Sequence, residues 1–194
     1  MRFLLYTILG LVIIVTGLLV ADKLTADNYE DCTAAFSTDK EQYQGGDSIK
    51  LTLIITTHKK EKEIKLHDNF DNLEFSTHFT RTCYTDKPEV GDCAFSTMIE
   101  ERTTKNKASD YKTYQISLDK PFKHTFIGTV SFDTTLNVYT ISFPDLGYQA
   151  SFKKEEYEIS KSYGFIGYLN DIKPAFGVSN PYVVVQYKSI KLKV

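Results

Sequence analysis

SIKLTLIITT, the stretch Ser48–Thr57, alternates between apolar and mostly polar residues along its whole length. Every second residue from Ile49 to Ile55 is a branched apolar residue, and polar residues such as Lys50 and Thr52 stand between them. Successive side chains of a β-strand point to opposite faces of a sheet. The alternation therefore predicts a strand with one face in a core and the other face toward solvent.

The same alternation continues along the rest of the chain. It recurs in residues 64–66, 73–79, 114–118, 126–132, 139–143, 148–152 and 182–194. In the last segment the apolar residues change from odd to even positions after residue 187, which indicates a β-bulge near Lys188 and Ser189 or a strand that moves between sheets. Roughly nine or ten short strands, with no long helical pattern beyond the N-terminal run, predict an antiparallel all-β domain.

The residues that lead into the first of these strands add an architectural hint. Phe36 is followed by Tyr43-Gln44-Gly45-Gly46-Asp47 and then by the strand itself. This arrangement resembles the A–B hairpin of immunoglobulin-like domains on bacterial surface proteins, in which a Tyr-x-x-Gly-Asp turn precedes an inward-alternating strand. The resemblance implies an immunoglobulin-like β-sandwich and nothing about activity. Because the chain has no Trp, the Cys…Trp…Cys core of antibody domains is excluded.

The N-terminus carries an apolar run, Phe3–Ala21, without a charged residue. As a helix it would extend about 28 Å, close to the ~30 Å hydrocarbon thickness of a bilayer. With Arg2 before it, the run predicts an uncleaved single-pass membrane anchor with a cytoplasmic N-terminus and residues 22–194 in the periplasm or outside the cell. The alternative is a signal peptide and a secreted domain, although Leu19 and Leu24 occupy the positions where cleavage after Ala21 or Ala26 needs small residues.

The predicted organisation has three parts. Residues 1–21 are the anchor, residues 22–32 are a juxtamembrane linker, and residues 33–194 are the β-sandwich domain. Without residues 1–21 the chain keeps 22 basic and 25 acidic residues, a net charge of −3. This balance excludes a general nucleic-acid-binding surface, which needs a clustered basic excess. The absence of an Asn-x-Ser/Thr sequon favours a bacterial source.

The interpretation of the three cysteines depends on the predicted location in the periplasm or outside the cell, where the environment is oxidising. Cys83 and Cys93 flank a turn-forming segment with Pro88 and Gly91, and we expect them to form a disulfide. The alternative is two free buried thiols. Cys32 is then the unpaired thiol; it either stays free, replaces a partner in the pair, or links a dimer.

The chain carries no motif for catalysis, a cofactor or a metal. The four histidines His58, His67, His78 and His124 lack the spacing of zinc ligands. The acidic segment 68–74 lacks the Asp-x-Asp-x-Asp-Gly spacing of a calcium loop. No Gly-x-Ser-x-Gly signature is present either. We therefore expect a protein that is not an enzyme and uses no cofactor.

Residues 153–181 form a long stretch in which the alternation fades. Long irregular connections often bind partners, and Gly residues between aromatic residues can present anchors to a protein. The candidate partner-binding residues are Tyr163, Phe165, Ile166, Tyr168 and Phe176. The alternative interpretation is that Phe165, Ile166 and Phe176 pack beneath the sandwich as a secondary core.

Two function classes follow from these observations. The first is a membrane-tethered binding protein that recognises a protein partner, either as an envelope component, a receptor, or an immunity or inhibitor protein. The second is an exported enzyme, most plausibly a hydrolase, whose site has no local signature. A cleft that gathers His67, Asp68 or His78 would favour the enzyme, and an exposed aromatic patch would favour the binding protein. The sequence favours binding.

Overall fold

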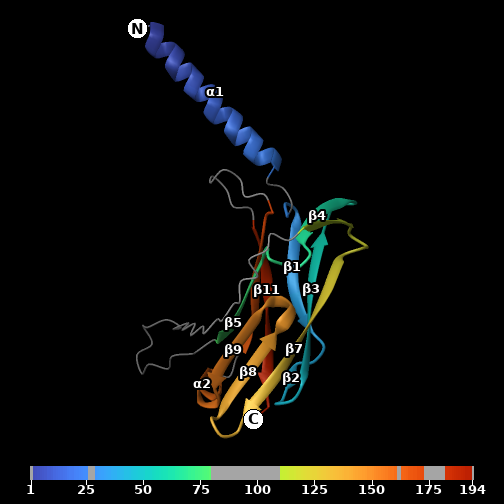
Figure 1. Ribbon diagram of the computed structural model, residues 1–194. Coiled ribbons are helices and arrows are strands. Elements are labelled where there is room, and N and C mark those ends of the chain that lie inside the picture. Colours follow the sequence, from blue (N-terminus) through green and yellow to red (C-terminus); the bar gives the residue numbers. More distant parts are fainter. Residues whose placement is uncertain (1, 26–28, 80–109, 161–162, 173–181, 194) are drawn as a thin grey trace, which may run out of the picture.

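The chain is rich in β-strands, as the alternating sequence predicts. The computed structural model describes residues 2–25, 29–79, 110–160, 163–172 and 182–193 (Figure 1). The strands are β1 (Cys32–Thr38), β2 (Gln42–Tyr43), β3 (Ser48–Thr57), β4 (Lys62–His67), β5 (Leu73–Phe79), β6 (Tyr111–Ile116), β7 (Phe122–Asp133), β8 (Val138–Phe143), β9 (Tyr148–Lys153), β10 (Tyr163–Asn170) and β11 (Tyr182–Leu192). The helical elements are α1 (Arg2–Thr25), the short 3-10 turn η1 (Pro144–Leu146) and α2 (Lys154–Ser160).

Strand β3 behaves as its alternation predicts. Ile49, Leu51, Leu53 and Ile55 are fully buried, while the residues between them are exposed or half-buried. On one side β3 pairs with β1, and on the other side it pairs with β7, both antiparallel. A strand held on both edges and buried on one face forms the centre of the sheet.

Most strands belong to one large mixed sheet. Its order is β5-β10-β11-β1-β3-β7-β8-β9, and β2 pairs with β11 beyond this path. The β1–β11 and β2–β11 pairs are parallel, whereas the other pairs are antiparallel. Strands β4 and β6 form a separate two-stranded sheet. The all-β class is confirmed, but two stacked antiparallel sheets of immunoglobulin type are not, because the pairing joins the strands into one continuous sheet.

The large sheet curls so that its two ends face each other. Phe75 of β5 lies at one end of the strand order, yet its ring centroid is 5.5 Å from that of Phe143 in β8 and 4.7 Å from that of Tyr148 in β9. Phe152 of β9 likewise stacks on Tyr163 of β10, at 4.8 Å. The aromatic side chains of both halves therefore meet in one core, where they bury large apolar areas.

The predicted irregularity of the last strand is present in β11. In the β10–β11 pair, Phe165 lies opposite Lys188 and Gly167 lies opposite Val185. Between these two pairs β11 therefore contains one residue more than β10. This is a β-bulge. It lies at residues 186–187, directly before the position that the change of parity indicated.

The predicted membrane anchor is contradicted. Helix α1 extends away from the sheet, at the opposite end of the molecule from the C-terminus (Figure 1). Among the residues that the structure describes, no helix is both long and apolar enough to cross a membrane. The predictions of a single-pass membrane protein and of the location that followed from it are corrected accordingly.

The predicted disulfide between Cys83 and Cys93 stays a prediction. In the described part of the chain the one cysteine is Cys32, and it is a free thiol. Cys83 and Cys93 lie outside the described residues.

The stretch 153–181 contains regular structure rather than one long irregular connection. Lys154–Ser160 forms α2, and Tyr163–Asn170 forms β10. Strand β10 lies between β5 and β11 inside the large sheet. Residues 163–170 are therefore strand residues, and their two faces have different environments.

Candidate functional site

The structure separates the five sequence-predicted partner-binding residues. Tyr163 and Phe165 are fully buried in the aromatic core, so their rings are not available to a partner in this structure. Ile166 and Tyr168 are half-buried, on the opposite face of β10. Phe176 lies outside the described residues. Strand β10 thus places two of the five candidates on an outer face and two in the core, because alternate residues of a strand point to opposite sides.

Strand β11 extends the outer face that Ile166 and Tyr168 begin. Tyr182, Val184 and Tyr187 are exposed to 57%, 45% and 41%. Tyr168 pairs with Val184 across the two strands, and Asn170 pairs with Tyr182. We call the group Ile166, Tyr168, Tyr182, Val184 and Tyr187 the outer aromatic face. No other described strand has three large apolar side chains with this degree of exposure.

Ring contacts and the β-bulge give this face its shape. The rings of Tyr168 and Tyr182 meet edge to face, with 5.8 Å between their centroids. The ring of Tyr187 lies over Gly164, where an added Cβ would stand only 2.4 Å from its Cζ atom and from the Lys188 carbonyl oxygen. A glycine at residue 164 therefore allows the end of the Tyr187 ring to pack closely against β10.

A polar rim borders the face toward β5. The side-chain amide of Asn170 donates a hydrogen bond of 2.8 Å to Glu74 Oε1. Glu74 itself pairs with Tyr168 in the sheet. The five residues of the outer aromatic face carry no charge, so an apolar centre with a polar edge results. Interfaces between proteins commonly have this arrangement.

Cys32, the predicted unpaired thiol, lies in the core. It is buried near the start of β1, and burial raises the pKa of its thiol above the ordinary value. A buried neutral thiol is a poor nucleophile and a poor partner for disulfide exchange. The predicted dimer through Cys32 stays a prediction.

The histidines that could support catalysis are dispersed. His124 packs against Phe70, with 4.3 Å between ring centroids, and burial lowers its pKa. The backbone N–H of His67 donates to the side-chain oxygen of Asn72. The side chain of His78 lies outside the described side chains. His124 is therefore a half-buried histidine packed on an aromatic ring, and its described side chain makes no hydrogen bond to a carboxylate of the kind that orients a general base.

The acidic segment 68–74 forms a structural turn. The backbone N–H of Asp71 donates to Asn69 Oδ1, and the Asp68 carboxylate lies 3.7 Å from the Lys112 ammonium. Asn72 points inward, where its amide donates to the Tyr29 hydroxyl at 2.8 Å. No group of three or more His, Cys, Asp or Glu side chains in the described ranges is placed to hold a metal ion. The polar residues of the segment are explained by the turn.

Sequence reasoning missed the three residues from β11. Residues 182–187 read YVVVQY, and the predicted alternation of this strand follows the odd positions. The missed signal is that the even positions Tyr182 and Val184 are apolar as well. A strand with one solvated face usually places polar residues there, so apolar residues on both faces indicate a second contact surface.

Comparisons with known proteins leave the family open. No protein-family model matches the chain, and no curated protein matches it. Among solved structures, the sporulation control protein Spo0M from Bacillus subtilis is similar, with a TM-score of 0.37 and 9% sequence identity. The similarity covers 84% of this chain and 50% of that chain, so this chain spans about half the length of that structure. At this TM-score the likeness carries no argument about function.

Proposed function

We propose that the protein is a binding module without catalytic activity, and that it recognises a protein partner through the outer aromatic face. The observation that carries the proposal is the exposure of Tyr182, Val184 and Tyr187 beside Ile166 and Tyr168. Single exposed apolar side chains are ordinary on protein surfaces, but a contiguous group on two paired strands is not. Tyr is also among the residue types that contribute most to protein–protein binding.

The chemistry of the face favours a protein over other classes of partner. Its centre is uncharged, which suits the apolar patch of a second protein and offers no cation for a phosphate backbone. Three tyrosines provide broad rings with hydroxyl groups that can accept or donate hydrogen bonds at the edge of an interface. The fitting partner is therefore a folded protein that presents an apolar patch with hydrogen-bonding groups around it.

The resemblance to immunoglobulin-like domains is consistent with a binding role. Such domains are β-rich scaffolds that bind through surfaces built on their strands and loops. The outer aromatic face is built on two paired strands, β10 and β11, which hold its side chains at defined spacing. We infer that the rigid sheet presents these rings in advance of binding, which lowers the entropy that association costs.

A paired set of surface variants tests the proposal. The face variant is Tyr182→Ser/Val184→Ser in the full chain, and the control variant is Tyr111→Ser/Ile127→Ser. The control replaces one tyrosine and one aliphatic residue, each 47% exposed, on β6 and β7. Each protein is used to capture partners from an extract of the native source, and captured proteins are identified by mass spectrometry. The affinity of a purified partner is then measured by calorimetry.

The expected result is a partner that the native chain and the control variant bind equally and the face variant binds at least ~30-fold more weakly. That factor corresponds to about 2 kcal/mol, the usual loss at an interface hot spot. Equal binding by the face variant would show that another surface is used. A measurable turnover of the partner by the native chain would contradict the non-catalytic part of the proposal.

A further inference from the structure

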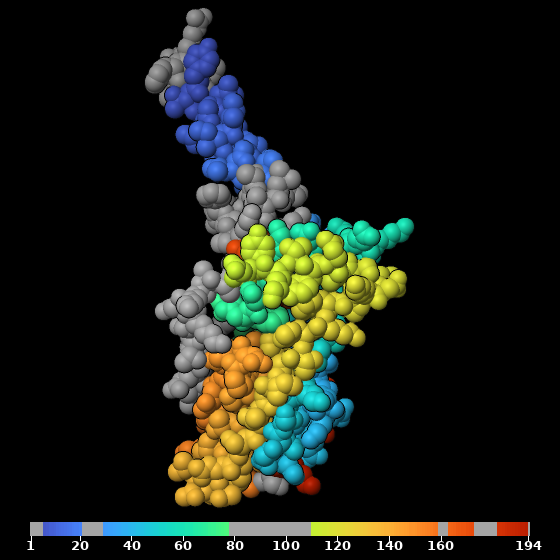
Figure 2. Space-filling view, turned by 45° about the vertical axis from the view of Figure 1, so that its right-hand side comes forward, coloured from blue at the N-terminus to red at the C-terminus, as the bar shows by residue number. Residues whose placement is uncertain are grey.

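Strand β6 lies at an edge of the small two-stranded sheet. It pairs antiparallel with β4, with Tyr111 opposite His67 and Ile116 opposite Lys62. No other strand in the described part of the chain pairs with β6. In Figure 2 the yellow-green atoms of β6 lie on the visible surface, beside the teal atoms of β4. An edge strand carries N–H and C=O groups that can pair with a further strand.

The ladder between β4 and β6 shows which backbone groups of β6 point outward. The N–H of Asp68 donates a hydrogen bond of 3.0 Å to the carbonyl oxygen of Asp110, directly beyond the end of the ladder. Opposed residues of an antiparallel pair alternate between hydrogen-bonded and non-hydrogen-bonded positions. The residues of β6 that bond to β4 are therefore the even-numbered ones. The backbone groups of Tyr111, Thr113 and Gln115 point away from β4.

The other edge of β4 supports this assignment, because side chains of the same domain bind its odd-numbered residues. The carbonyl oxygen of Lys65 accepts a hydrogen bond of 2.8 Å from the Tyr29 hydroxyl. The N–H of His67 donates to the side-chain oxygen of Asn72 at 3.1 Å. The outward groups of β4 are thus occupied within the chain, and that edge is closed to a further strand.

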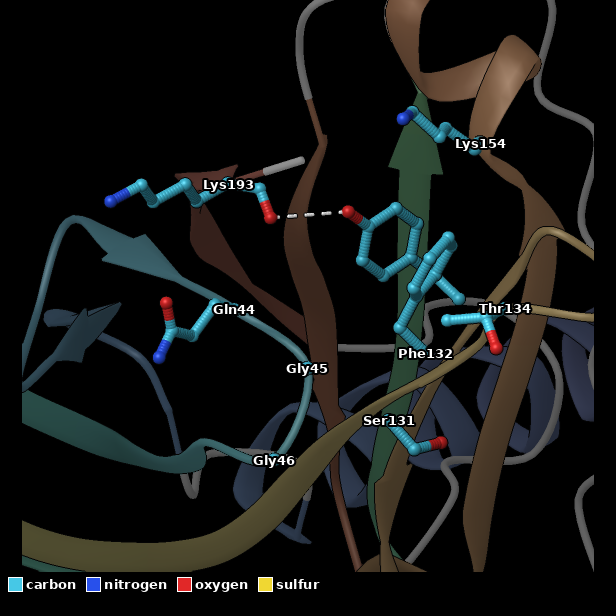
Figure 3. A pocket seen from close by; sticks show the side chains of 9 residues that line it. Gln44, Gly45, Gly46, Ser131, Phe132, Thr134, Lys154 and Lys193 are labelled. Atoms are coloured by element: carbon cyan, nitrogen blue, oxygen red, sulfur yellow. Dashed lines mark hydrogen bonds between the residues drawn. The ribbon is translucent and has the colours of Figure 1, made fainter.

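The end of β11 is closed in a similar way. The carbonyl oxygen of Lys193 accepts a hydrogen bond of 3.2 Å from the Tyr139 hydroxyl, which Figure 3 draws as the dashed line at the wall of a pocket. In the described ranges no such group meets the outward backbone of Tyr111, Thr113 and Gln115, and all three residues are exposed. The edge of β6 is therefore open where comparable positions are occupied.

Side-chain contacts of β6 lie toward β4 rather than over the open edge. Lysine on an edge strand opposes pairing with another strand. The one charged residue of β6, Lys112, has its ammonium 3.7 Å from the carboxylate of Asp68, directly after β4. The side-chain amide of Gln115 donates to Glu63 of β4 at 3.1 Å. The single charge of the strand is therefore balanced by an acid on the β4 side.

From these observations we propose that β6 pairs antiparallel with β6 of a second copy of this chain, with Thr113 opposite its own counterpart. This register places Tyr111 of one copy opposite Gln115 of the other, so outward residues meet only outward residues. Each of these pairs exchanges two backbone hydrogen bonds. Lys112 falls opposite Tyr114, so no like charges face each other across the contact.

The pairing would extend the small sheet from two strands to four. A two-stranded sheet is marginal in water, and additional strands stabilise it. Ile64 and Leu66 bury β4 in the core, so the edge is presented on a fixed support. A contact of one patch with itself has the two-fold symmetry that most dimers use. The edge is separate from the outer aromatic face on β10 and β11, so this inference is independent of the proposed function.

Disulfide trapping in the full chain tests the register. The Cα atoms of a hydrogen-bonded antiparallel pair lie about 5.5 Å apart, within the reach of a disulfide. The test variant is Thr113→Cys, and the control variant is Gln115→Cys, which changes an exposed residue on the same face of β6. In the proposed register the two copies of residue 115 are offset by roughly 14 Å along the strands, too far for a disulfide.

Each variant is oxidised as purified protein and in an extract of the native source, and linked peptides are identified by mass spectrometry. We expect a disulfide between the introduced thiols of two Thr113→Cys chains, and at least about tenfold less of the corresponding link in Gln115→Cys. Equal linkage in the two variants, or none in either, would overturn the proposal. A link from Thr113→Cys to another protein in place of a second copy would assign the edge to a foreign strand and overturn it as well.

Charge variants measure the same contact at equilibrium. Thr113→Lys places two ammonium groups opposite each other, whereas Gln115→Lys places the added charge opposite Tyr111. Because like charges directly opposite each other weaken strand pairing, sedimentation equilibrium should give a dimer dissociation constant at least roughly threefold higher for Thr113→Lys than for Gln115→Lys. Equal constants for the two variants, or a native chain that stays monomeric at every concentration measured, would contradict the pairing.

Discussion

The sequence predicts which residues face the core in some strands and not in others. The inward positions of β3, such as Ile49 and Leu51, could be assigned from sequence because one visible period separates core from solvent. The assignment of Tyr163 and Phe165 to a partner surface could not be checked in that way. Glycines around them hide the period, and only their distant pairing with β5 and β11 turns these rings into the core.

Gly128 is a residue whose role follows from packing alone. It faces the core from β7, and an added Cβ would lie 2.5 Å from the Phe143 ring, which is itself fully buried. We expect Gly128→Ala to lower the free energy of unfolding by about 1–3 kcal/mol, because the ring has no room to move. Urea denaturation measures the change. Gly17→Ala is the control, since its Cβ would meet no atom within 4 Å, and an equal loss in that variant would exclude the packing explanation.

The positions of the strands in the sequence were easier to predict than the pairing between the strands. Alternation located most strands and the bulge of β11, because each depends on a local period. The pairing that joins β1 to β11 in parallel, and β5 to β10, links residues far apart in the chain. No local pattern carries that information. The outer aromatic face was therefore half-predicted: its β10 residues were candidates, and the β11 residues beside them were not.

Strands β5 and β9, which are the two ends of the sheet, are joined by a buried side-chain contact. The hydroxyl of Thr77 hydrogen-bonds to the hydroxyl of Tyr148, and both residues are buried. We expect Thr77→Val and Tyr148→Phe each to destabilise the fold by about 1–2 kcal/mol, because each leaves a buried hydroxyl with one partner fewer. The double variant should lose less than the sum, with a coupling near 1 kcal/mol in urea denaturation.

A second double-mutant cycle, on an exposed pair of hydroxyls, is the matched control for the contact between Thr77 and Tyr148. The hydroxyls of Thr52 and Thr125 also hydrogen-bond, at 2.9 Å, but across the exposed face of β3 and β7. Water can replace that bond, so the corresponding cycle with Thr52→Val and Thr125→Val should show a coupling below about 0.5 kcal/mol. Equal coupling in the two cycles would mean that burial at the β5–β9 contact adds nothing to the stability of the curled sheet.

For the whole molecule, buried tyrosines make stability depend on alkaline pH. Burial is the main cause that raises the pKa of Tyr29, Tyr139 and Tyr163, and it raises the pKa of Tyr43 to about 12 with help from the hydrogen bond to Asp39. An unfolded tyrosine titrates near pH 10. Between these values the unfolded chain loses protons that the folded chain keeps, so the free energy of unfolding falls as pH rises above about 10.

Replacing one of these tyrosines should flatten that dependence. In Tyr43→Phe the slope of unfolding free energy against pH, between about pH 10 and 12, should decrease by up to one proton, about 1.4 kcal/mol per pH unit. Because the variant also loses the bond from Tyr43 to Asp39, its stability at neutral pH should fall by roughly 1 kcal/mol, and the slope is therefore the diagnostic quantity. Urea denaturation at a series of pH values measures both. Tyr111→Phe removes an exposed hydroxyl and should leave the slope as in the native chain. If Tyr43→Phe keeps the full slope, the raised pKa of Tyr43 does not contribute to alkaline unfolding.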